Sequence, residues 1–439
     1  MNNPNEYDIE YTDSQFDAIT STSPECIFVG GIGSGKSFAL GQFVLNEACL
    51  VGSLGILTAP TSGTLNLSTL PACKKIWSKL GLVQDIDYII GKRPPKNWGI
   101  KPYSEYNGNV LTWAWGSYTI VDGSDNYDAH RGTELDYVAG DEFRDFKDGA
   151  YEMFQGRMRG EAKKAIGGDY RMLFVTTPPD NPNKVQDLIS ERVQVIYGNS
   201  FENQHNLPPG YLVGLKHSYD EITYRREVLG ELIYSGGSAA YHAFSDQNIV
   251  SMPFMPNAPT VMAWDFNASA KKPMSTGLIQ QIGSKWYLTK EFINKNSNTD
   301  EQCQVVLEFF KNVGFNGTLV VTGDYSGFRK ESNATRSDYA IIELYFKHYP
   351  SFRNQTRPTL SIRDRVSSLN AQFCNMAGER NFYVDSSCKK TIEDLQKTRY
   401  KENGTTLDDT DPERTHPSDM VSYWASNWYP SDRKPIVYG

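Results

Sequence analysis

CIFVGGIGSGKSFALGQFVLNEA, residues 26–48, is the stretch that decides the fold of the first half of the chain. Its first four residues are apolar and have the length of a buried parallel strand. Residues 30–37 fit the pattern GxxxxGK[ST] of a phosphate-binding loop, and residues 38–48 carry apolar side chains at helical spacing. Strand, loop and helix follow in the order that such a loop requires. The stretch therefore predicts a nucleotide-binding domain with a parallel sheet.

The eight residues of this loop have distinct predicted roles. Glycine at four positions lets the backbone curl so that its N–H groups face phosphate oxygens. The helix that follows adds the positive end of its dipole. Lys36 would reach the β- and γ-phosphates, and Ser37 would offer its hydroxyl to Mg²⁺. The predicted nucleotide ligands of the loop are Gly30, Gly31, Ile32, Gly33, Ser34, Gly35, Lys36 and Ser37.

A pair of acids farther along the chain completes the predicted nucleotide site. Asp141 and Glu142 end the segment LDYVAGDE, which is mostly apolar and strand-like. Asp141 would hold Mg²⁺ directly or through water, and Glu142 would orient and deprotonate the attacking water. Asp136 interrupts the apolar run, and residues 143–148 continue with mixed charge. A solvated loop is therefore the alternative interpretation.

Two more apolar stretches, residues 55–60 and 172–177, fit strands of the same sheet. Alternating strands and helical stretches predict a doubly wound parallel sheet, which binds ligands at the carboxyl ends of its strands. Thr176 and Thr177 end the second stretch and would point toward the γ-phosphate as nucleotide ligands. A polar strand end without such a role is the alternative.

Arg131 and Gln15 are weaker candidates for the same site. Arg131 precedes Glu142 in the sequence, and an arginine near the γ-phosphate neutralises charge in the transition state, from the same or a neighbouring subunit. A surface ion pair is the commoner role of an arginine. Gln15 lies shortly before the first strand, where its paired amide donor and acceptor would read the adenine edge.

The second half of the chain opens with a new pattern of strands. Residues 234–240, YSGGSAA, are small and predict a hinge. Beyond three prolines, apolar stretches separated by turn residues predict an antiparallel meander, then a helix and one more strand. The predicted strands are 260–267, 275–282 and 284–293, followed by a helix at 300–310 and a strand at 318–324.

Three strands, a helix and a strand that ends in Asp form the order of an RNase H-like nuclease core. In that layout the first and fourth strands lie side by side and parallel. Asp265 and Asp324, which end these two strands, would then face each other. Asp at a strand end is ordinary by itself, so the prediction depends on the order of the elements.

Asp419 is the predicted third acid of the same site. It would lie in the first turn of a helix capped by Thr415 or Ser418. His416, three residues earlier, would join the metal ligands or orient them. Two ions about 4 Å apart need several carboxylates in a small space, and oxygen ligands with one histidine suit Mg²⁺ or Mn²⁺. Competing acids in a turn are Asp408, Asp409 and Asp411.

A locally basic region lies between the second and third acids. Basic residues with interleaved aromatic residues suit a groove that follows a phosphate backbone, and a solvated helix face explains part of the pattern. The basic residues are Arg353, Arg357, Arg363, Arg365, Lys389, Lys390, Lys397 and Arg399, and the aromatic ones are Phe382, Tyr383 and Tyr400.

Length and composition bound these predictions. A chain of 439 residues is long enough for two or three domains, and 39% hydrophobic residues argue against disorder. Six scattered cysteines without a CxxC pair exclude a disulfide framework and a zinc site, and fit a reducing cytosol. No apolar stretch has the length of a membrane span, and the polar N-terminus is unlike a signal peptide. A net charge of −8 by itself argues against a nucleic-acid partner.

A phosphate-loop ATPase followed by an RNase H-like nuclease resembles the large terminase subunit of tailed bacteriophages. The resemblance covers nearly the whole chain, with an ATPase motor domain at 1–240, including a linker subdomain at about 200–240, and a nuclease domain at 241–439. It depends on the ordered set of motifs rather than on any single nuclease motif. The motifs are Gln15, residues 30–37, Arg131-Gly132, Asp141-Glu142, Thr176-Thr177, residues 231–244, Asp265, Asp324, and His416 with Asp419.

The resemblance implies an ATP-driven pump that threads double-stranded viral DNA through the portal protein into the procapsid and cuts concatemeric DNA. It implies ATP with Mg²⁺ in the motor and two Mg²⁺ or Mn²⁺ ions in the nuclease. It further implies a small terminase subunit as partner, a ring of five copies on the portal, a free monomer in the host cytoplasm, and no membrane partner. Arg131 would act in trans, and Thr176 and Thr177 would couple hydrolysis to movement.

Two other classes of protein stay open on the sequence. One is a helicase-like or repair ATPase whose second domain is structural, and the other is a DNA- or portal-binding adaptor without activity. A transposase or integrase uses similar acids but seldom carries a phosphate-binding loop, so residues 30–37 argue against that class.

Overall fold

The computed structural model describes residues 9–104, 108–180, 184–190, 193–267, 272–330 and 336–430. The chain divides into two compact units, of which unit 1 comprises Met1–Pro208 and Arg225–Ile233, and unit 2 comprises Pro209–Tyr224 and Tyr234–Gly439. The chain therefore passes between the units three times. The assignment of residues 1–240 and 241–439 to two functional domains stays a prediction. Within the described parts of the chain, none of the helices combines the length and the apolar character needed to cross a membrane.

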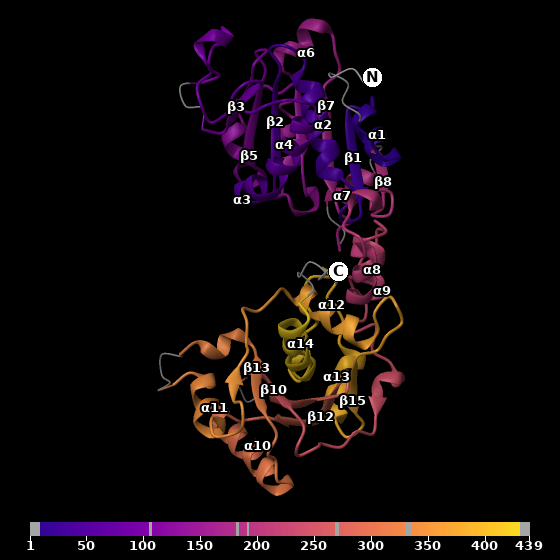
Figure 1. The fold of residues 1–439 in the computed structure, drawn as a ribbon, viewed down its shortest axis with the longest axis vertical. Helices are drawn as coiled ribbons and strands as arrows, with labels where there is room; N and C mark the ends of the chain where they lie inside the picture. Colours follow the sequence, from indigo (N-terminus) through magenta and orange to yellow (C-terminus); the bar gives the residue numbers. More distant parts are fainter. Residues whose placement is uncertain are drawn as a thin grey trace. The chain divides into compact units, whose positions relative to one another are not determined.

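Unit 1 is built on a sheet of eight strands in the order β3-β4-β5-β2-β6-β7-β1-β8 (Figure 1). β4 pairs antiparallel with both β3 and β5, and all other neighbours pair in parallel. This arrangement confirms the predicted doubly wound sheet of a P-loop ATPase. The strands are β1 (Glu25–Gly30), β2 (Leu54–Ala59), β3 (Tyr88–Ile90), β4 (Val110–Trp113), β5 (Tyr118–Gly123), β6 (Tyr137–Gly140), β7 (Arg171–Thr176) and β8 (Gln194–Gly198).

Helices cover both faces of this sheet because its central strands are apolar on both sides. On β1, Phe28 belongs to one buried cluster, whereas Ile27 and Val29 belong to another. The first cluster is covered by α1 (Asp13–Thr20), α2 (Lys36–Ala48) and α4 (Leu70–Lys79), and the second by α5 (Ala150–Gln155) and α7 (Lys184–Ser190). β1, the loop and α2 therefore take the places that the sequence predicts.

Unit 2 is built on a sheet of seven strands in the order β14-β13-β10-β11-β12-β15-β9. β10, β11 and β12 form an antiparallel meander, and β13 lies parallel to β10. This confirms the RNase H-like order. The strands are β9 (Ile249–Val250), β10 (Thr260–Asp265), β11 (Met274–Ile282), β12 (Lys285–Asn294), β13 (Leu319–Gly323), β14 (Arg353–Asn354) and β15 (Phe382–Asp385).

Helices also cover both faces of the second sheet (Figure 1). Residues of α10 (Thr299–Val313) and α11 (Asp338–Phe346) pack with Met262 and Trp264 of β10. Residues of α12 (Ile362–Phe373), α13 (Lys389–Lys397) and α14 (His416–Trp428) pack with Val261 and Ala263 on the other side of the same strand.

The remaining elements are short. They are α3 (Ser62–Thr64), α6 (Glu161–Ile166), α8 (Tyr211–Ser218), α9 (Glu221–Glu227), a π-helical turn at Leu65–Thr69, and 3-10 turns at Lys96–Trp98, Ser124–His130, Phe143–Asp145, Gln204–Asn206, Asp246–Asn248 and Tyr325–Phe328.

The cap of α14 differs from the prediction. Neither Thr415 nor Ser418 caps the helix with its side chain. Instead, their backbone N–H groups donate to the buried carboxylate of Asp394 on α13, at 3.0 Å each. Asp394 thereby satisfies two N–H groups at the start of the helix from a different element. The cap that sequence reasoning placed inside the segment is supplied from outside it.

Asp136 also proves to be structural rather than solvated. Its carboxylate is buried and accepts hydrogen bonds from the backbone N–H of Leu54 (2.9 Å) and of Lys163 (2.7 Å). It precedes β6 instead of interrupting it, so the apolar strand runs uninterrupted to Gly140.

Candidate active sites

The loop between β1 and α2 curls around the side chain of Lys36. The Lys36 ammonium donates to the carbonyl oxygens of Gly30 and Gly31, at 2.8 Å each, and is buried. Burial lowers the pKa of Lys36, and the carboxylates of Glu142 and Asp141 oppose that shift. The cation is therefore held at the carboxyl end of β1, where the sequence places a phosphate.

Asp141 and Ser37 come together as predicted. The Ser37 hydroxyl donates to Asp141 Oδ2 at 3.0 Å, and the hydroxyl of Thr69 donates to the same oxygen at 2.7 Å. Burial and the charge of Glu142 raise the pKa of Asp141, whereas these hydrogen bonds lower it. A serine hydroxyl and a carboxylate in contact are hard oxygen ligands, so this donor set fits Mg²⁺.

Glu142 lies at the mouth of the site in a left-handed backbone conformation, with φ of 49°. Its carboxylate accepts a hydrogen bond from Thr177 (3.5 Å) and lies 4.0 Å from Nε of Arg144. A positive φ is unusual for a residue other than glycine.

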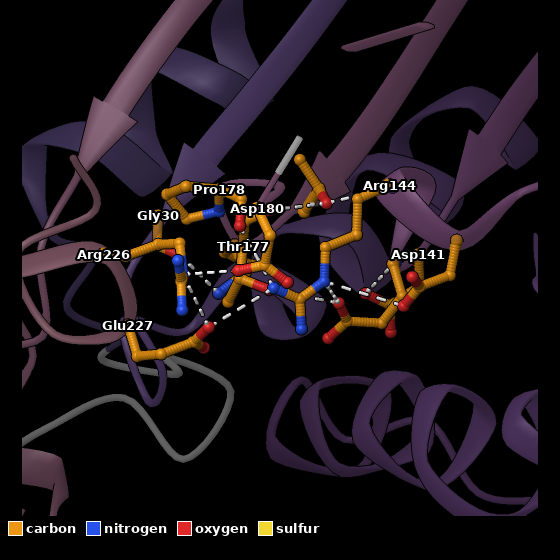
Figure 2. A network of polar contacts seen from close by, with 12 residues as sticks. Gly30, Asp141, Arg144, Thr177, Pro178, Asp180, Arg226 and Glu227 are labelled. Atoms are coloured by element: carbon orange, nitrogen blue, oxygen red, sulfur yellow. Dashed lines mark hydrogen bonds and ion pairs between the residues drawn. The ribbon is translucent and has the colours of Figure 1, made fainter. Parts of the chain in front are cut away.

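Arg144 heads a network of charges that sequence reasoning missed (Figure 2). It donates to the carbonyl of Pro178 (3.1 Å) and pairs with Glu227 (3.5 Å). Glu227 pairs in turn with Arg226 (3.5 Å), which binds Asp180 at 2.7 Å. The members of this network are distant in the sequence. The charged residues after β6 and in α9 are the only sequence feature that indicates them.

Segments after β8 and α9 lie directly against the phosphate-binding loop. The N–H of Gly31 donates to the carbonyl of Gly198 (3.1 Å), and the N–H of Ile32 donates to the carbonyl of Glu227 (2.6 Å). A Cβ atom on Gly31 would meet the carbonyl oxygen of Val228 at 2.3 Å. Glycine is therefore required at this position by close backbone approach as well as by the curl of the loop.

A cavity of about 610 Å³ opens beside the loop. Gln15 lines it, but its amide donates to the carbonyl of Ser34 (2.9 Å) and accepts from the N–H of Thr12 (3.3 Å). A Cβ on Gly35, which has φ of 86°, would lie 2.0 Å from the Gln15 amide nitrogen. Predicted residues that line the cavity are Gln15, Ile32, Gly33, Gly35, Lys36, Ser37, Glu142 and Thr177, and residues that the sequence did not indicate include Asn203, His205, Asn206 and Leu207.

Arg131 and Thr176 are not among the residues that line this cavity. Arg131 is exposed and pairs with Asp128 at 2.7 Å, without lining the cavity of its own chain. Thr176 donates to the carbonyl of Thr177 (2.9 Å) and accepts from the N–H of Arg144 (3.1 Å). Thr176 therefore supports the turn that carries Arg144.

In unit 2, the structure brings Asp265 and Asp324 to the same edge of the sheet. Trp264 and Gly323 are partners in the β10–β13 ladder, and the N–H of Asp324 donates to the carbonyl of Trp264 (3.1 Å). Asp324 also accepts from Thr359 (3.1 Å) and from the hydroxyl of Ser326.

His416 and Asn267 hold the carboxylate of Asp265. His416 Nδ1 lies 2.9 Å from Asp265 Oδ2, and the Asn267 amide donates to the same oxygen at 2.6 Å. His416 is therefore in direct contact with Asp265, the first of the three predicted acids.

Asp419 is held by a buried arginine. Arg365 of α12 donates to Asp419 Oδ1 at 3.0 Å and to the Ser422 hydroxyl at 2.6 Å. Burial raises the pKa of Asp419, and the Arg365 guanidinium lowers it. The sequence grouped Arg365 with basic residues that suit a phosphate-binding groove, whereas the structure buries its side chain against Asp419.

Burial raises the pKa of the Tyr423 phenol, and the charge of the Arg365 guanidinium opposes this rise. The carboxylates of Asp265, Asp419 and Asp324 add to it. As the side chains stand in the described residues, no group of three or more His, Cys, Asp or Glu is arranged to hold an ion. The set of carboxylate oxygens with one imidazole nitrogen nevertheless has the chemistry that Mg²⁺ or Mn²⁺ requires.

The comparison with known proteins decides the family. The family model of the terminase large subunit, T4likevirus-type, N-terminal, matches residues 27–246. The chain belongs to the large terminase subunit family. No curated protein matches its sequence.

Solved terminase structures resemble the whole chain in fold. The large terminase of the thermophilic bacteriophage D6E has 14% identity and a TM-score of 0.62, over 95% of this chain and 99% of that chain. Its complex with ADP has 15% identity and a TM-score of 0.61 over the same shares. Its complex with ATP-gamma-S has 15% identity and a TM-score of 0.60, over 98% of this chain and 100% of that chain.

The competing acids and the aromatic residues named from the sequence lie in different surroundings. Asp409 and Asp411 form surface ion pairs with Lys401 and Arg414. Phe382 and Tyr400 belong to the buried core of unit 2, so their prediction as interleaved surface aromatics is wrong. An aromatic residue between charged residues has the same sequence pattern whether it faces a groove or a core. The sequence alone therefore could not show that Phe382 and Tyr400 face the core.

Proposed function

We propose that this terminase is the subunit of a viral DNA-packaging motor. It hydrolyses ATP to move double-stranded DNA through the portal into the procapsid, and it cleaves concatemeric DNA. The observation that carries the proposal is the meeting of Lys36, Ser37 and Glu142 at one cavity, with Asp141 hydrogen-bonded to Ser37, in a member of this family. The nucleotide complexes of the D6E terminase support the same interpretation.

For ATP hydrolysis, the loop binds the phosphates and Lys36 exchanges the carbonyls of Gly30 and Gly31 for phosphate oxygens. Ser37 and Asp141 would hold Mg²⁺, which neutralises charge on the phosphates. Glu142 orients the attacking water and accepts its proton, and Thr177 holds the carboxylate of Glu142. Gln15 reads the adenine, and Arg131, exposed on this chain, acts on the site of a neighbouring copy.

For DNA cleavage, Asp265, Asp324 and Asp419 would hold Mg²⁺ or Mn²⁺, which activates water and stabilises the leaving oxygen. His416 and Asn267 orient the carboxylate of Asp265. Asp265 and Asp324 come from the ends of two parallel strands, and Asp419 comes from the first turn of α14.

We base the proposed setting on membership of the family. The partners are viral DNA, the portal protein, the small terminase subunit and further copies in a ring of five, whereas the free protein is a monomer. The protein acts in the cytoplasm of the bacterial host and at the portal vertex of the procapsid.

A plasmid assay with the full chain tests both activities. In Mn²⁺, the protein should cleave plasmid DNA, and ATP turnover should be measurable in the same preparation. Turnover without cleavage would contradict the nuclease proposal and favour a helicase-like ATPase with a structural unit 2. Cleavage without turnover would contradict the motor proposal.

A further inference from the structure

Two exposed aromatic rings follow directly after Asp324. Tyr325 and Phe328 begin and end a 3-10 turn, here called the aromatic turn (residues 325–328), and they are 43% and 45% exposed. Their ring centroids lie 5.3 Å apart. Single exposed apolar residues are ordinary, but neighbouring exposed rings beside a candidate catalytic acid indicate a binding surface.

The aromatic turn is fixed to Asp324 through its backbone. Asp324 Oδ1 accepts a hydrogen bond from the N–H of Ser326 (3.2 Å), and the carbonyl of Asp324 accepts from the N–H of Gly327 (3.2 Å). A Cβ atom on Gly327 would lie 2.4 Å from the ring of Phe266, the residue that follows Asp265. The turn therefore lies at the end of β13 and packs against the residue after the end of β10, so it is close to both of these acids.

A row of packed rings holds Phe328 in place. Its ring centroid lies 4.5 Å from that of Tyr339 on α11, and the ring of Tyr339 lies 5.1 Å from that of Phe266. Phe266 stacks in turn on the buried Trp264, at 5.6 Å. The hydroxyl of Tyr339 also donates to the carbonyl of Asp324 (2.8 Å). A ring that is held in this way loses little freedom when it binds a partner.

Cationic side chains accompany the aromatic turn. Arg329 and Lys330 follow it directly and are exposed. Arg353, also exposed, lies on β14, which pairs with β13. Positive charges that follow phosphates, together with aromatic rings on which bases stack, are the combination that binds unpaired nucleic acid. Charge complementarity therefore favours DNA as the partner of this surface.

We propose that the aromatic turn stacks on a DNA base next to the phosphate that the nuclease cuts, so that Tyr325 and Phe328 influence where DNA is cut. This inference depends on the proposed nuclease function. In a duplex, the base must first leave the stack of its neighbours, which is easiest at pyrimidine–purine steps and in unpaired DNA. The rings should therefore favour cleavage at TA and CA/TG steps and in single-stranded segments.

Binding of a short single-stranded oligonucleotide that carries 2-aminopurine tests the stacking without cleavage. The full-length protein is used in EDTA, and stacking is detected as quenching of the 2-aminopurine fluorescence. Phe328→Ala should weaken binding about tenfold and reduce the quenching, because each stacked base contributes a factor of roughly this size or more. Phe328→Trp should retain both. The matched control is Tyr103→Ala, which removes a 38% exposed ring that packs on Tyr118 in unit 1.

Mapping the cut sites tests the second part of the proposal. In Mn²⁺, the wild type should cut plasmid DNA preferentially at pyrimidine–purine steps, and Phe328→Ala should lose most of this preference. Tyr325→Ala should have the same effect to a smaller extent, and it changes a residue at the exposed start of the turn. Circular dichroism checks that both variants are folded.

The two measurements separate the possible failures. If affinity, quenching and cut sites are unchanged in folded Phe328→Ala and Tyr325→Ala proteins, the proposal is overturned while the nuclease function stands, and the rings would be a contact for another protein. A wild type that stacks on bases but cuts no DNA would overturn the nuclease function, and with it the role of the aromatic turn in selecting cut sites.

Discussion

The proposed nucleotide site of unit 1 and the proposed nuclease site of unit 2 both hold carboxylates and a buried cation, but they are assembled differently. In the nucleotide site the cation, Lys36, belongs to the same loop as the phosphate-binding backbone. In the nuclease site the three acids and Arg365 come from two strand ends and two helices. A site whose centre is one continuous segment is largely specified by local sequence, whereas a scattered site depends on packing for its charges. The two buried cations therefore have different partners, since Lys36 is held by carbonyl oxygens of its own loop and Arg365 is held by a carboxylate of another helix.

The scattered site should be the more sensitive to loss of a single carboxylate. Asp324→Ala should reduce DNA cleavage in Mn²⁺ by about 1000-fold or more, because metal-bound charge stabilisation is worth several kcal/mol. ATP turnover should stay within twofold of wild type. Asp411→Asn, a change in a surface ion pair, is the matched control. Cleavage that survives Asp324→Ala would contradict the assignment of the acid.

Loss of Lys36 from the proposed nucleotide site should greatly reduce ATP turnover without affecting DNA cleavage. Lys36→Ala should reduce ATP turnover by about 100- to 1000-fold, the usual effect of removing one preorganised electrostatic group. Cleavage of plasmid without ATP should persist. Lys164→Ala removes an exposed lysine paired with Glu161 and should leave turnover unchanged. If Lys36→Ala retained turnover, the loop would have a role other than phosphate binding.

A smaller effect on ATP turnover is expected when a charge partner of Arg144 is removed from the proposed nucleotide site. Glu227→Gln removes one carboxylate partner of Arg144, so Arg144 should shift toward Glu142 and weaken the catalytic base. We expect kcat for ATP to fall about tenfold, equivalent to roughly 1.4 kcal/mol, with KM nearly unchanged. Glu231→Gln, which alters a half-exposed pair with Arg225, is the control. A rise in KM without a change in kcat would point to a role in binding instead.

The smallest effect concerns stability rather than activity. Burial alone would raise the pKa of Asp220, but hydrogen bonds from His242 and Thr223 and the charge of His242 hold it below its usual range. A carboxyl group with a lowered folded-state pKa contributes stability above the unfolded pKa of about 4, and this contribution is lost as pH falls. In Asp220→Asn, the Tm of unit 2 should therefore fall less between pH 6 and pH 3 than in the wild type. Parallel pH profiles of the two proteins would contradict this assignment.

The two sites also differ in how much of them could be predicted from sequence. Residues of the loop at 30–37 lie close to Asp141 and Glu142 in the structure, as expected from the sequence, because a phosphate-binding loop carries its own strand, turn and helix signals. The order of strands in unit 2 likewise placed Asp265 and Asp324 at one edge. The partners of these residues could not be predicted. Neither the contact of Arg365 with Asp419 nor the cap that Asp394 provides to α14 has a local signal, since each joins elements that meet only through tertiary packing.

Arg144 and Gln15 illustrate the same limit within unit 1. Arg144 reads as one charge in a mixed loop, and its importance appears only when α9 brings Glu227 to it. Gln15 was predicted from its position, but its contact with the carbonyl of Ser34 requires α1 to lie against the loop. The sequence identifies candidate reactive residues more readily than it identifies the residues that position them.

The hydrogen bonds of Gly31 and Ile32 have a consequence for the synthesis of the protein. The phosphate-binding loop leaves the ribosome early, yet its backbone is completed by the carbonyls of Gly198 and Glu227, which are made much later. A nascent chain that ends before Gly198 lacks both acceptors. The motif that marks this protein most clearly in its sequence is therefore among the last parts of unit 1 to reach its final form, and the growing chain has no finished nucleotide site until α9 has emerged.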